Sequence, residues 1–98
     1  MVTKQQAIAE IEAHVEECGH AQYGWYVGIT KDPRGRLFGD HGVSEKNGAW
    51  IYRETSSAGV ARDVETYFLA KGFQGGEGGG DAASVHVYAY KITASTTE

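Results

Sequence analysis

Apolar residues recur every three or four positions near the start of the chain and predict a helix there. The residues of this stripe are Ala7, Ile8, Ile11 and Val15. This spacing is typical of an amphipathic helix with one face packed on a core, so we expect a helix over residues 4–17. Thr3, followed three residues later by Gln6, has the pattern of a capping box at its first turn.

Three later segments are rich in aromatic and β-branched residues and predict strands. They cover residues 25–30, 49–55 and 85–92. In the second strand, Trp50 and Tyr52 should lie on one face and Ile51 on the other. The third strand alternates in the same way, with Val85, Val87, Ala89 and Lys91 on one face and His86, Tyr88, Tyr90 and Ile92 on the other.

Two further helices are predicted between the strands. Asp32 and Pro33 suit the N-cap and first position of a short helix that runs to about residue 39. Ser56 or Ser57 should cap a longer helix that ends at Gly72. The residues expected to point inward from this helix are Val60, Ala61, Val64, Phe68 and Leu69.

These elements predict an α+β fold with a small three-stranded, mainly antiparallel sheet flanked by helices. We expect one domain over residues 1–98, with its core at about 24–93 and the helix of residues 4–17 packed on it. The connections are about 10 to 20 residues long, so hairpin rules do not give the order of the strands.

The charge balance argues against a broad electrostatic attraction to nucleic acid. The 98-residue chain has a formal net charge of −4, so contact with a polyanion requires a local basic patch. Positive charge does gather at Lys31, Arg34, Arg36, Lys46 and Arg53. No apolar run is long enough for a membrane span, the N-terminus lacks a signal-peptide pattern, and Cys18 is the only cysteine, so we expect a cytoplasmic protein without a membrane partner.

The segment "YVGITKDPRGRL" resembles the second half of the GIY-YIG nuclease signature. Tyr26, Val27 and Gly28 correspond to the second tripeptide, and Arg36 stands at the spacing of the family's catalytic arginine. His41 lies near the position of a histidine that many members have after this arginine. Further on, "AGVARDVETYFLAKG" is similar to the family's later helix, where Glu65 follows Ala61 by four residues and corresponds to a metal-binding glutamate. The resemblance covers about residues 24–72 and implies the GIY-YIG fold.

The sequence departs from the family pattern at two places. The strand of the first tripeptide is missing upstream of Tyr26, and the asparagine expected after the glutamate helix has no match in "GGEGGGDAA". The strand of residues 85–92 resembles the missing one, so we hypothesise a permuted arrangement in which it lies beside residues 25–30. Tyr88 would then stand for the first motif tyrosine.

The resemblance implies a metal-dependent endonuclease that hydrolyses phosphodiester bonds in DNA or RNA. Glu65 would hold one Mg²⁺ or Mn²⁺ through a carboxylate oxygen, and Arg36 would contact the scissile phosphate with its planar fork. Tyr26 or Tyr88 would position or deprotonate the attacking water. Lys31 and Arg34 would bind the flanking phosphates, and His41 would also contact the substrate.

Simpler interpretations remain open for each of these residues. Tyr26 suits an ordinary sheet position, Arg36 can pair with Asp32, and Glu65 can pair with Arg62. The alternative function is a catalytically inactive module on the same fold that binds nucleic acid or a partner protein. A protein partner or a homodimer is compatible with either function. Cys18 and the histidines lack the paired spacing of a structural zinc site, and the glycine-rich segment 75–80 lacks the residues of a P-loop.

Overall fold

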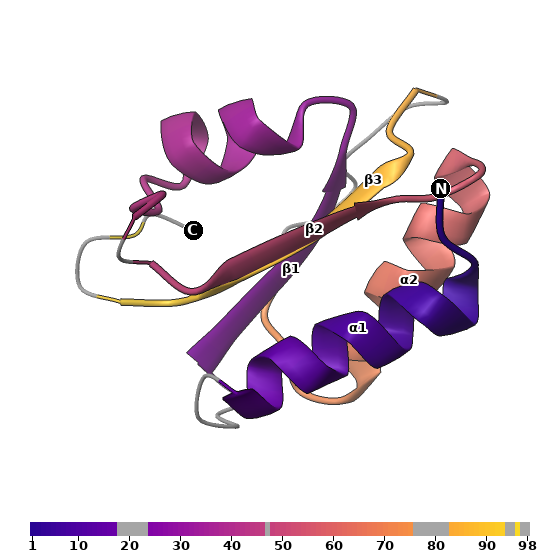
Figure 1. The fold of residues 1–98 in the computed structure, drawn as a ribbon, viewed down its shortest axis with the longest axis horizontal. Helices are drawn as coiled ribbons and strands as arrows, with labels where there is room; N and C mark the ends of the chain where they lie inside the picture. The colour runs from indigo at the N-terminus through magenta and orange to yellow at the C-terminus, as the bar shows by residue number, and fades with distance from the viewer. Residues whose placement is uncertain (18–23, 47, 76–82, 94–95, 97–98) are drawn as a thin grey trace.

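The described residues form three strands and two α-helices, with one short π-helical segment (Figure 1). The computed structural model describes residues 1–17, 24–46, 48–75, 83–93 and 96. The elements in chain order are α1 (Lys4–Glu17), β1 (Trp25–Thr30), η2 (Gly35–Asp40), β2 (Trp50–Glu54), α2 (Ala58–Ala70) and β3 (His86–Lys91). The α+β class is therefore confirmed, and each expected strand and helix is present.

The strand order of the sheet is β1-β3-β2, and both pairings are antiparallel. The last strand in the sequence is thus the central one, and it separates the two earlier strands. Tyr88 in β3 is the register partner of Gly28 in β1 and of Tyr52 in β2. Residues 85–92 therefore lie beside residues 25–30, which is the pairing that the permutation hypothesis requires.

The two faces of the sheet carry different cores. In Figure 1, α1 and α2 lie on one side of the sheet, and the helix that follows β1 lies on the other. On the side that faces α1 and α2, the strands contribute Trp25 and otherwise aliphatic residues, namely Val27, Ile29, Ile51, Val87 and Ala89. The opposite side is aromatic and includes Tyr26, Tyr88 and Tyr90 with Leu37 and Val43. The alternation of side chains along each strand produces this division.

The predicted helix starts are confirmed by their hydrogen bonds. The Thr3 N–H donates to Gln6 Oε1 at 2.9 Å, and the Gln6 N–H donates to Thr3 Oγ1 at 3.1 Å, which makes a complete capping box. At the start of α2, Ser57 Oγ accepts the Val60 N–H at 3.2 Å. Of the two serines considered, Ser57 is the N-cap.

The inward position expected for Leu69 is wrong, because its exposed fraction is 39%. The chain reverses at Gly72, whose φ of 106° is in the left-handed region that favours glycine. This reversal brings Phe73 under the end of α2, with its ring 4.8 Å from that of Phe68. Phe73, at 5% exposure, belongs to the core on this side of the sheet, and Leu69 does not.

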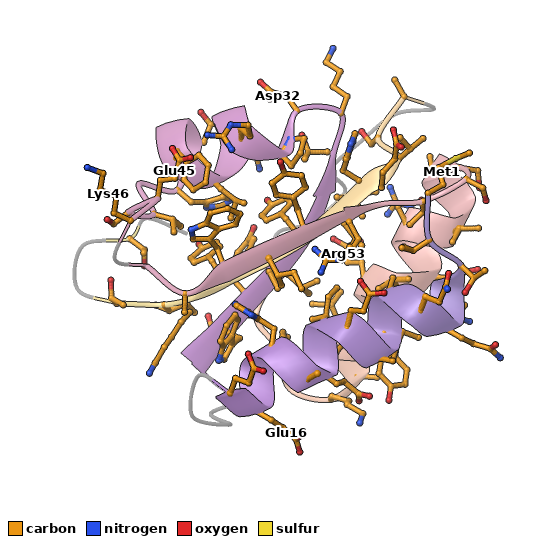
Figure 2. The ribbon with its side chains drawn as sticks, viewed as in Figure 1. Met1, Glu16, Asp32, Glu45, Lys46 and Arg53 are labelled. Carbon is orange, nitrogen blue, oxygen red and sulfur yellow. The ribbon has the colours of Figure 1, made fainter. Side chains whose placement is uncertain are left out.

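The short helix η2 has the hydrogen bonding of a π-helix. The His41 N–H donates to the Arg36 carbonyl at 2.9 Å, five residues earlier. Asp32, at the turn after β1 in Figure 2, accepts the Gly35 N–H with Oδ1 at 3.1 Å, as its predicted capping role requires. The wider turn places Arg36 and His41, five residues apart, one turn from each other. Single π-helical turns of this kind occur frequently at functional sites.

The two edges of the sheet are treated differently. Gln74 pairs with the outer side of β1, accepting the Val27 N–H at 2.8 Å and donating to the Trp25 carbonyl at 2.9 Å. At the outer side of β2, the Val2 N–H donates to the Glu54 carbonyl at 2.9 Å, near one end of the strand.

Within the described residues, no helix is long and apolar enough to span a membrane.

Candidate active site

The hydroxyl of Tyr88 lies at the centre of the predicted site residues. Tyr88 stands in the central strand, and its side chain is 1% exposed. The ring extends across β1 at Gly28, where a Cβ would stand 2.5 Å from the Tyr88 oxygen. The missing side chain of Gly28 therefore creates the space in which the hydroxyl lies. This contact explains why the third residue of the tripeptide Tyr26-Val27-Gly28 is a glycine.

His41 joins two tyrosine hydroxyls from β3. Its Nε2 lies 2.9 Å from the Tyr88 oxygen, and its Nδ1 lies 3.0 Å from the Tyr90 oxygen. His41 is 3% exposed and lies directly after η2, so the imidazole is held between the helix and the sheet. A neutral imidazole has one donor and one acceptor nitrogen, so its bonds to the two hydroxyls run in opposite senses.

Arg36 reaches the same hydroxyl from η2. Its Nη1 donates to Asp40 Oδ2 at 2.9 Å, and the guanidinium also hydrogen-bonds with Tyr88. Burial disfavours the charged form, but the bonds to Asp40 and Tyr88 keep the pKa of Arg36 above its ordinary value. Arg36 therefore stays cationic beside Tyr88. Its ion-pair partner is Asp40, so the pairing with Asp32 considered from the sequence is wrong.

Tyr26 packs against this group through its aromatic ring. Its ring lies 4.7 Å from that of His41 and is stacked on Tyr90 at 5.2 Å and on Tyr88 at 6.4 Å, measured between ring centres. At 7% exposure it belongs to the aromatic core of this face. The ordinary sheet role of Tyr26 is thus present, and the residue also borders the Tyr88 site.

Glu65 approaches from α2 as a buried carboxylate. It is 8% exposed on a helix whose other inward residues are apolar. Its nearest cation is Arg62, at an N–O distance of 3.9 Å, which is a long ion pair. Burial raises the pKa of Glu65, and the charge of Arg62 offsets this only in part. A buried carboxylate with so weak a partner is stabilised when a cation approaches it.

Tyr88 and Glu65 interact electrostatically, although α2 lies on the other side of the sheet from η2. Burial raises the pKa of Tyr88 to about 12, and the negative charge of Glu65 also raises it, whereas Arg36 acts in the opposite direction. One phenol is therefore influenced by both the predicted phosphate-binding arginine and the predicted metal-binding glutamate. Arg36 and Glu65 themselves lie on opposite sides of the sheet, and Tyr88 is the residue that both charges influence.

The other predicted substrate-binding residues lie at the margin. Lys31 is exposed just beyond β1. Arg34 is also exposed and forms an ion pair with Glu45, and its guanidinium lies 5.1 Å from the centre of the Phe38 ring. It further hydrogen-bonds with Tyr52. The structure brings Tyr26, Arg36, His41 and Tyr88 together and leaves Lys31 and Arg34 as outer cations.

A preformed metal centre is absent among the described residues, where no three His, Cys, Asp or Glu side chains are grouped for a metal. His14 packs edge-on against Trp25 at 5.9 Å, on the α1 side of the sheet, whereas His41 lies on the aromatic side. Cys18 and His20 lie outside the described residues. Glu65 suits Mg²⁺ as a single hard oxygen ligand, because this ion uses one or two carboxylates together with water and substrate phosphates.

Tyr90 is a member of the site that the sequence comparison with the family did not single out. It bonds to His41 and stacks on Tyr26, and it is fully buried. The signal that could have found it is the alternation in β3, which places Tyr90 on the same face as Tyr88. The missing information was the position of His41 above that face.

Comparisons with protein-family models, with curated proteins and with solved structures found no significant match to this chain. The geometry of the described residues is therefore the basis for a functional proposal.

Proposed function

We propose that this chain is a small metal-dependent endonuclease-like domain that hydrolyses phosphodiester bonds in nucleic acid. In this proposal it is a permuted relative of the GIY-YIG nucleases, in which β3 takes the place of the first motif strand. The observation that carries the proposal is the Tyr88 hydroxyl, which bonds to His41 and Arg36 and is influenced by the charge of Glu65.

The hydrogen bonds around Tyr88 suggest where its proton would go. Arg36 can only donate, so it bonds to the Tyr88 oxygen and leaves the phenolic proton for His41 Nε2. In that arrangement Nδ1 carries a proton and donates it to the Tyr90 oxygen. Tyr90 is thus a positioning residue, because its oxygen selects the tautomer of His41 that can accept from Tyr88.

The reaction would use Tyr88 as the group that takes a proton from water. The water oxygen bonds to phosphorus, the bond from phosphorus to the leaving ester oxygen breaks, and that oxygen takes a proton from solvent. The proton released by the water passes to the Tyr88 oxygen, while the phenolic proton moves to His41. Arg36 would neutralise charge on the phosphate oxygens.

Glu65 is the residue that would hold Mg²⁺ or Mn²⁺. When bound, the cation would supply positive charge and would offset the negative charge of Glu65, which raises the pKa of Tyr88. The cation is needed because Tyr88, with a pKa of about 12, gives up its proton only weakly at neutral pH. The proposal therefore makes activity depend on the metal and on Glu65 together.

A second candidate function is a catalytically inactive module that binds nucleic acid or a partner protein. The observation that favours it is the pairing of both site arginines with carboxylates, Arg34 with Glu45 and Arg36 with Asp40, in a chain of net charge −4. These pairs are exposed and therefore weak, so a phosphate could displace either carboxylate. Binding without hydrolysis requires only this exchange.

Cleavage assays distinguish the two functions. Supercoiled plasmid and labelled single-stranded and branched oligonucleotides are incubated with Mg²⁺ or Mn²⁺ and, separately, with chelator. The variants are Tyr88→Phe, Arg36→Ala and Glu65→Ala, and the matched control is Tyr67→Phe, which removes a hydroxyl bonded to Glu12 on the far helix pair.

A nuclease is expected to give metal-dependent cleavage that falls at least 100-fold in the three site variants and stays within twofold in Tyr67→Phe. Equal background from all proteins, or cleavage that survives in Tyr88→Phe, would overturn the catalytic proposal. Retained binding of labelled oligonucleotide in that case would favour the inactive module.

A further inference from the structure

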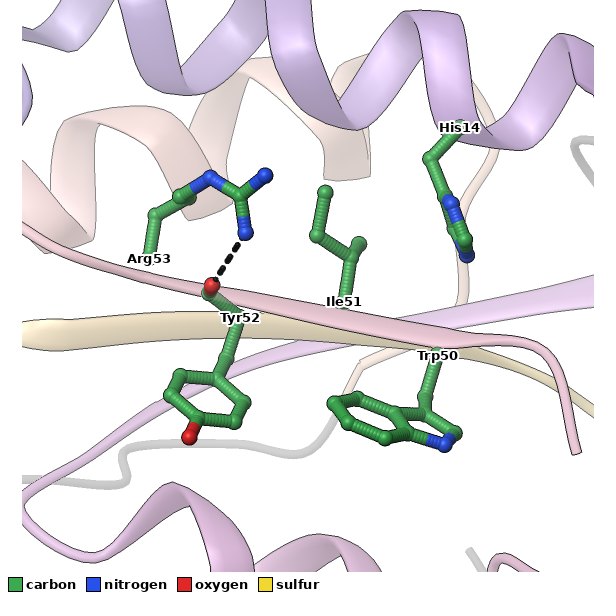
Figure 3. Close-up of a pocket in the computed structure, with 5 residues that line it drawn as sticks. All are labelled: His14, Trp50, Ile51, Tyr52 and Arg53. Carbon is green, nitrogen blue, oxygen red and sulfur yellow. Dashed lines mark hydrogen bonds between the residues drawn. The ribbon is translucent and has the colours of Figure 1, made fainter. Parts of the chain in front are cut away.

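Two aromatic rings stand side by side at the open edge of the sheet. Trp50 and Tyr52 in β2 have ring centres 6.0 Å apart and planes that differ by 11°. Both are half-buried, and Figure 3 shows them on the same side of β2, with Ile51 and Arg53 on the other. We call this pair of near-parallel rings the aromatic platform.

The platform is held in place by contacts from η2, from the segment that follows it and from β3. Trp50 Nε1 donates to the Glu45 carbonyl at 3.1 Å, and the Phe38 ring meets Trp50 edge-on with the ring centres 5.0 Å apart. Tyr52 contacts the His86 ring of the neighbouring strand at 6.3 Å. The two rings are therefore fixed before any ligand binds, which lowers the entropic cost of stacking on them.

Open space adjoins the platform along β2. A surface hollow of about 410 Å³ is lined by residues from β2 and α1, namely His14, Trp50, Ile51, Tyr52 and Arg53 (Figure 3). A hollow of this size is large enough for a planar ligand such as a nucleobase. Trp50 and Tyr52 line it from one side of β2, and His14, Ile51 and Arg53 line it from the side that faces α1.

The platform is continuous with the candidate active site. Tyr52 is the register partner of Tyr88, and Trp50 is the partner of Tyr90, so both rings lie on the same face of the sheet as the site tyrosines. Arg34 hydrogen-bonds with Tyr52, which places a cation at the platform as well. Aromatic surface and positive charge thus lie together on the strand next to the one that carries Tyr88, whose hydroxyl reaches across the sheet over β1.

We propose that the aromatic platform stacks against an unpaired base of the substrate, next to the phosphate that meets Arg36 and Tyr88. In a continuous duplex the bases stack on each other, so their faces are not free for a side chain. Proteins that bind single strands combine aromatic stacking with a cationic path for the backbone. The preferred substrate is therefore single-stranded or branched nucleic acid, and this inference rests on the proposed function.

Binding without cleavage tests the platform. A fluorescein-labelled single-stranded oligonucleotide and the matched duplex are titrated with protein in chelator, and anisotropy is recorded. The variants are Trp50→Leu and Tyr52→Leu, and the matched control is Tyr67→Leu, on the opposite side of the molecule. Each platform variant is expected to weaken single-strand binding about 5- to 100-fold while Tyr67→Leu stays within twofold.

A second measurement uses the wild-type protein and does not depend on how the variants fold. Trp25 is fully buried, so quenching of tryptophan fluorescence by an unlabelled single strand would report on Trp50. The proposal expects quenching by the single strand and little by the duplex at the same concentration. Equal quenching by both, or none by either, would overturn it.

The outcomes separate this inference from the proposed function. Metal-dependent cleavage together with unchanged single-strand binding in Trp50→Leu and Tyr52→Leu would overturn the platform and leave the nuclease. Platform-dependent binding of single strands without any cleavage would support the platform and overturn the nuclease. The duplex titration excludes a general loss of charge attraction, because that loss would weaken both substrates equally.

Discussion

The Tyr88 hydroxyl occupies the volume that a side chain at position 28 would fill. A Cβ on Gly28 would lie 2.5 Å from the Tyr88 oxygen and 2.6 Å from the ring carbon that carries it. The two residues are also register partners in the pairing of β1 with β3. The position of the hydroxyl and the residue type at 28 are therefore linked.

We expect Gly28→Ala to displace the Tyr88 ring from His41. Overpacking of this kind costs about 1 to 3 kcal/mol of unfolding free energy, and we expect cleavage to fall at least tenfold. Urea unfolding and the oligonucleotide assay measure both effects, with Gly59→Ala as the control, because a Cβ there meets no atom closer than 3.7 Å. Wild-type activity in Gly28→Ala would contradict a role for the Tyr88 position.

Tyr88 should make the fold less stable at alkaline pH. Its pKa is about 12 in the folded protein and about 10 in an unfolded chain. The folded state therefore holds more protons between these values, so the free energy of unfolding falls as pH rises from about 10 to 12. In Tyr88→Phe this part of the decline should disappear, whereas Tyr67→Phe should retain it. Chemical unfolding at a series of pH values makes the comparison.

Glu65→Gln should stabilise the protein and remove the effect of Mg²⁺ on its Tm. Because burial raises the pKa of Glu65, the folded state disfavours the charged form, and stability is lost as pH rises through that pKa. At pH 7 the amide avoids this cost, and we expect Tm to rise by a few degrees, where about 4–8 °C corresponds to 1 kcal/mol in a domain of this size.

The control for Glu65→Gln is Glu16→Gln, an exposed position on α1 where the same change should leave Tm within about a degree. A lower Tm in Glu65→Gln would mean that the pairing with Arg62 outweighs the cost of burial. In that case, titration of the wild-type protein with Mg²⁺ should leave its Tm unchanged.

Tyr90→Phe should weaken the site without abolishing the fold. The change removes the hydroxyl that bonds to His41 Nδ1, a loss of about 0.5 to 1.5 kcal/mol for a typical hydrogen bond. If Tyr90 sets the tautomer of His41, cleavage should fall by more than tenfold while substrate binding stays unchanged. Equal activity in Tyr90→Phe and wild type would show that the tautomer is set by another group.

Much of the secondary structure could be predicted from local patterns, because each pattern acts within a few residues. The capping box at Thr3, the cap at Ser57 and the alternation in β3 depend on neighbours in sequence, and all three are confirmed. Leu69 was predicted to be buried but is exposed, whereas Phe73, after the reversal at Gly72, packs against Phe68 in the core. A helical stripe alone does not indicate which of its members the rest of the chain will cover.

The site could be predicted only in part. The spacing from Tyr26 to Arg36 and the helix with Glu65 indicated candidate residues, but the strand order that brings Tyr88 beside Gly28 is a long-range property. The π-helical turn of η2 was not predicted either, and it determines where His41 lies relative to Arg36. Tyr90 was missed for the same reason, since its role depends on that histidine.

The central place of β3 determines when the site can first exist. β1 and β2 have no pairing with each other, and both pair with the strand that is synthesised after them. During translation, neither strand can find its partner until residues 86–91 have left the ribosome. Pairings this distant in sequence form slowly, because loop closure precedes any gain from contact. The same strand delivers Tyr88 and Tyr90, so the sheet and the candidate catalytic group should be completed in a single step.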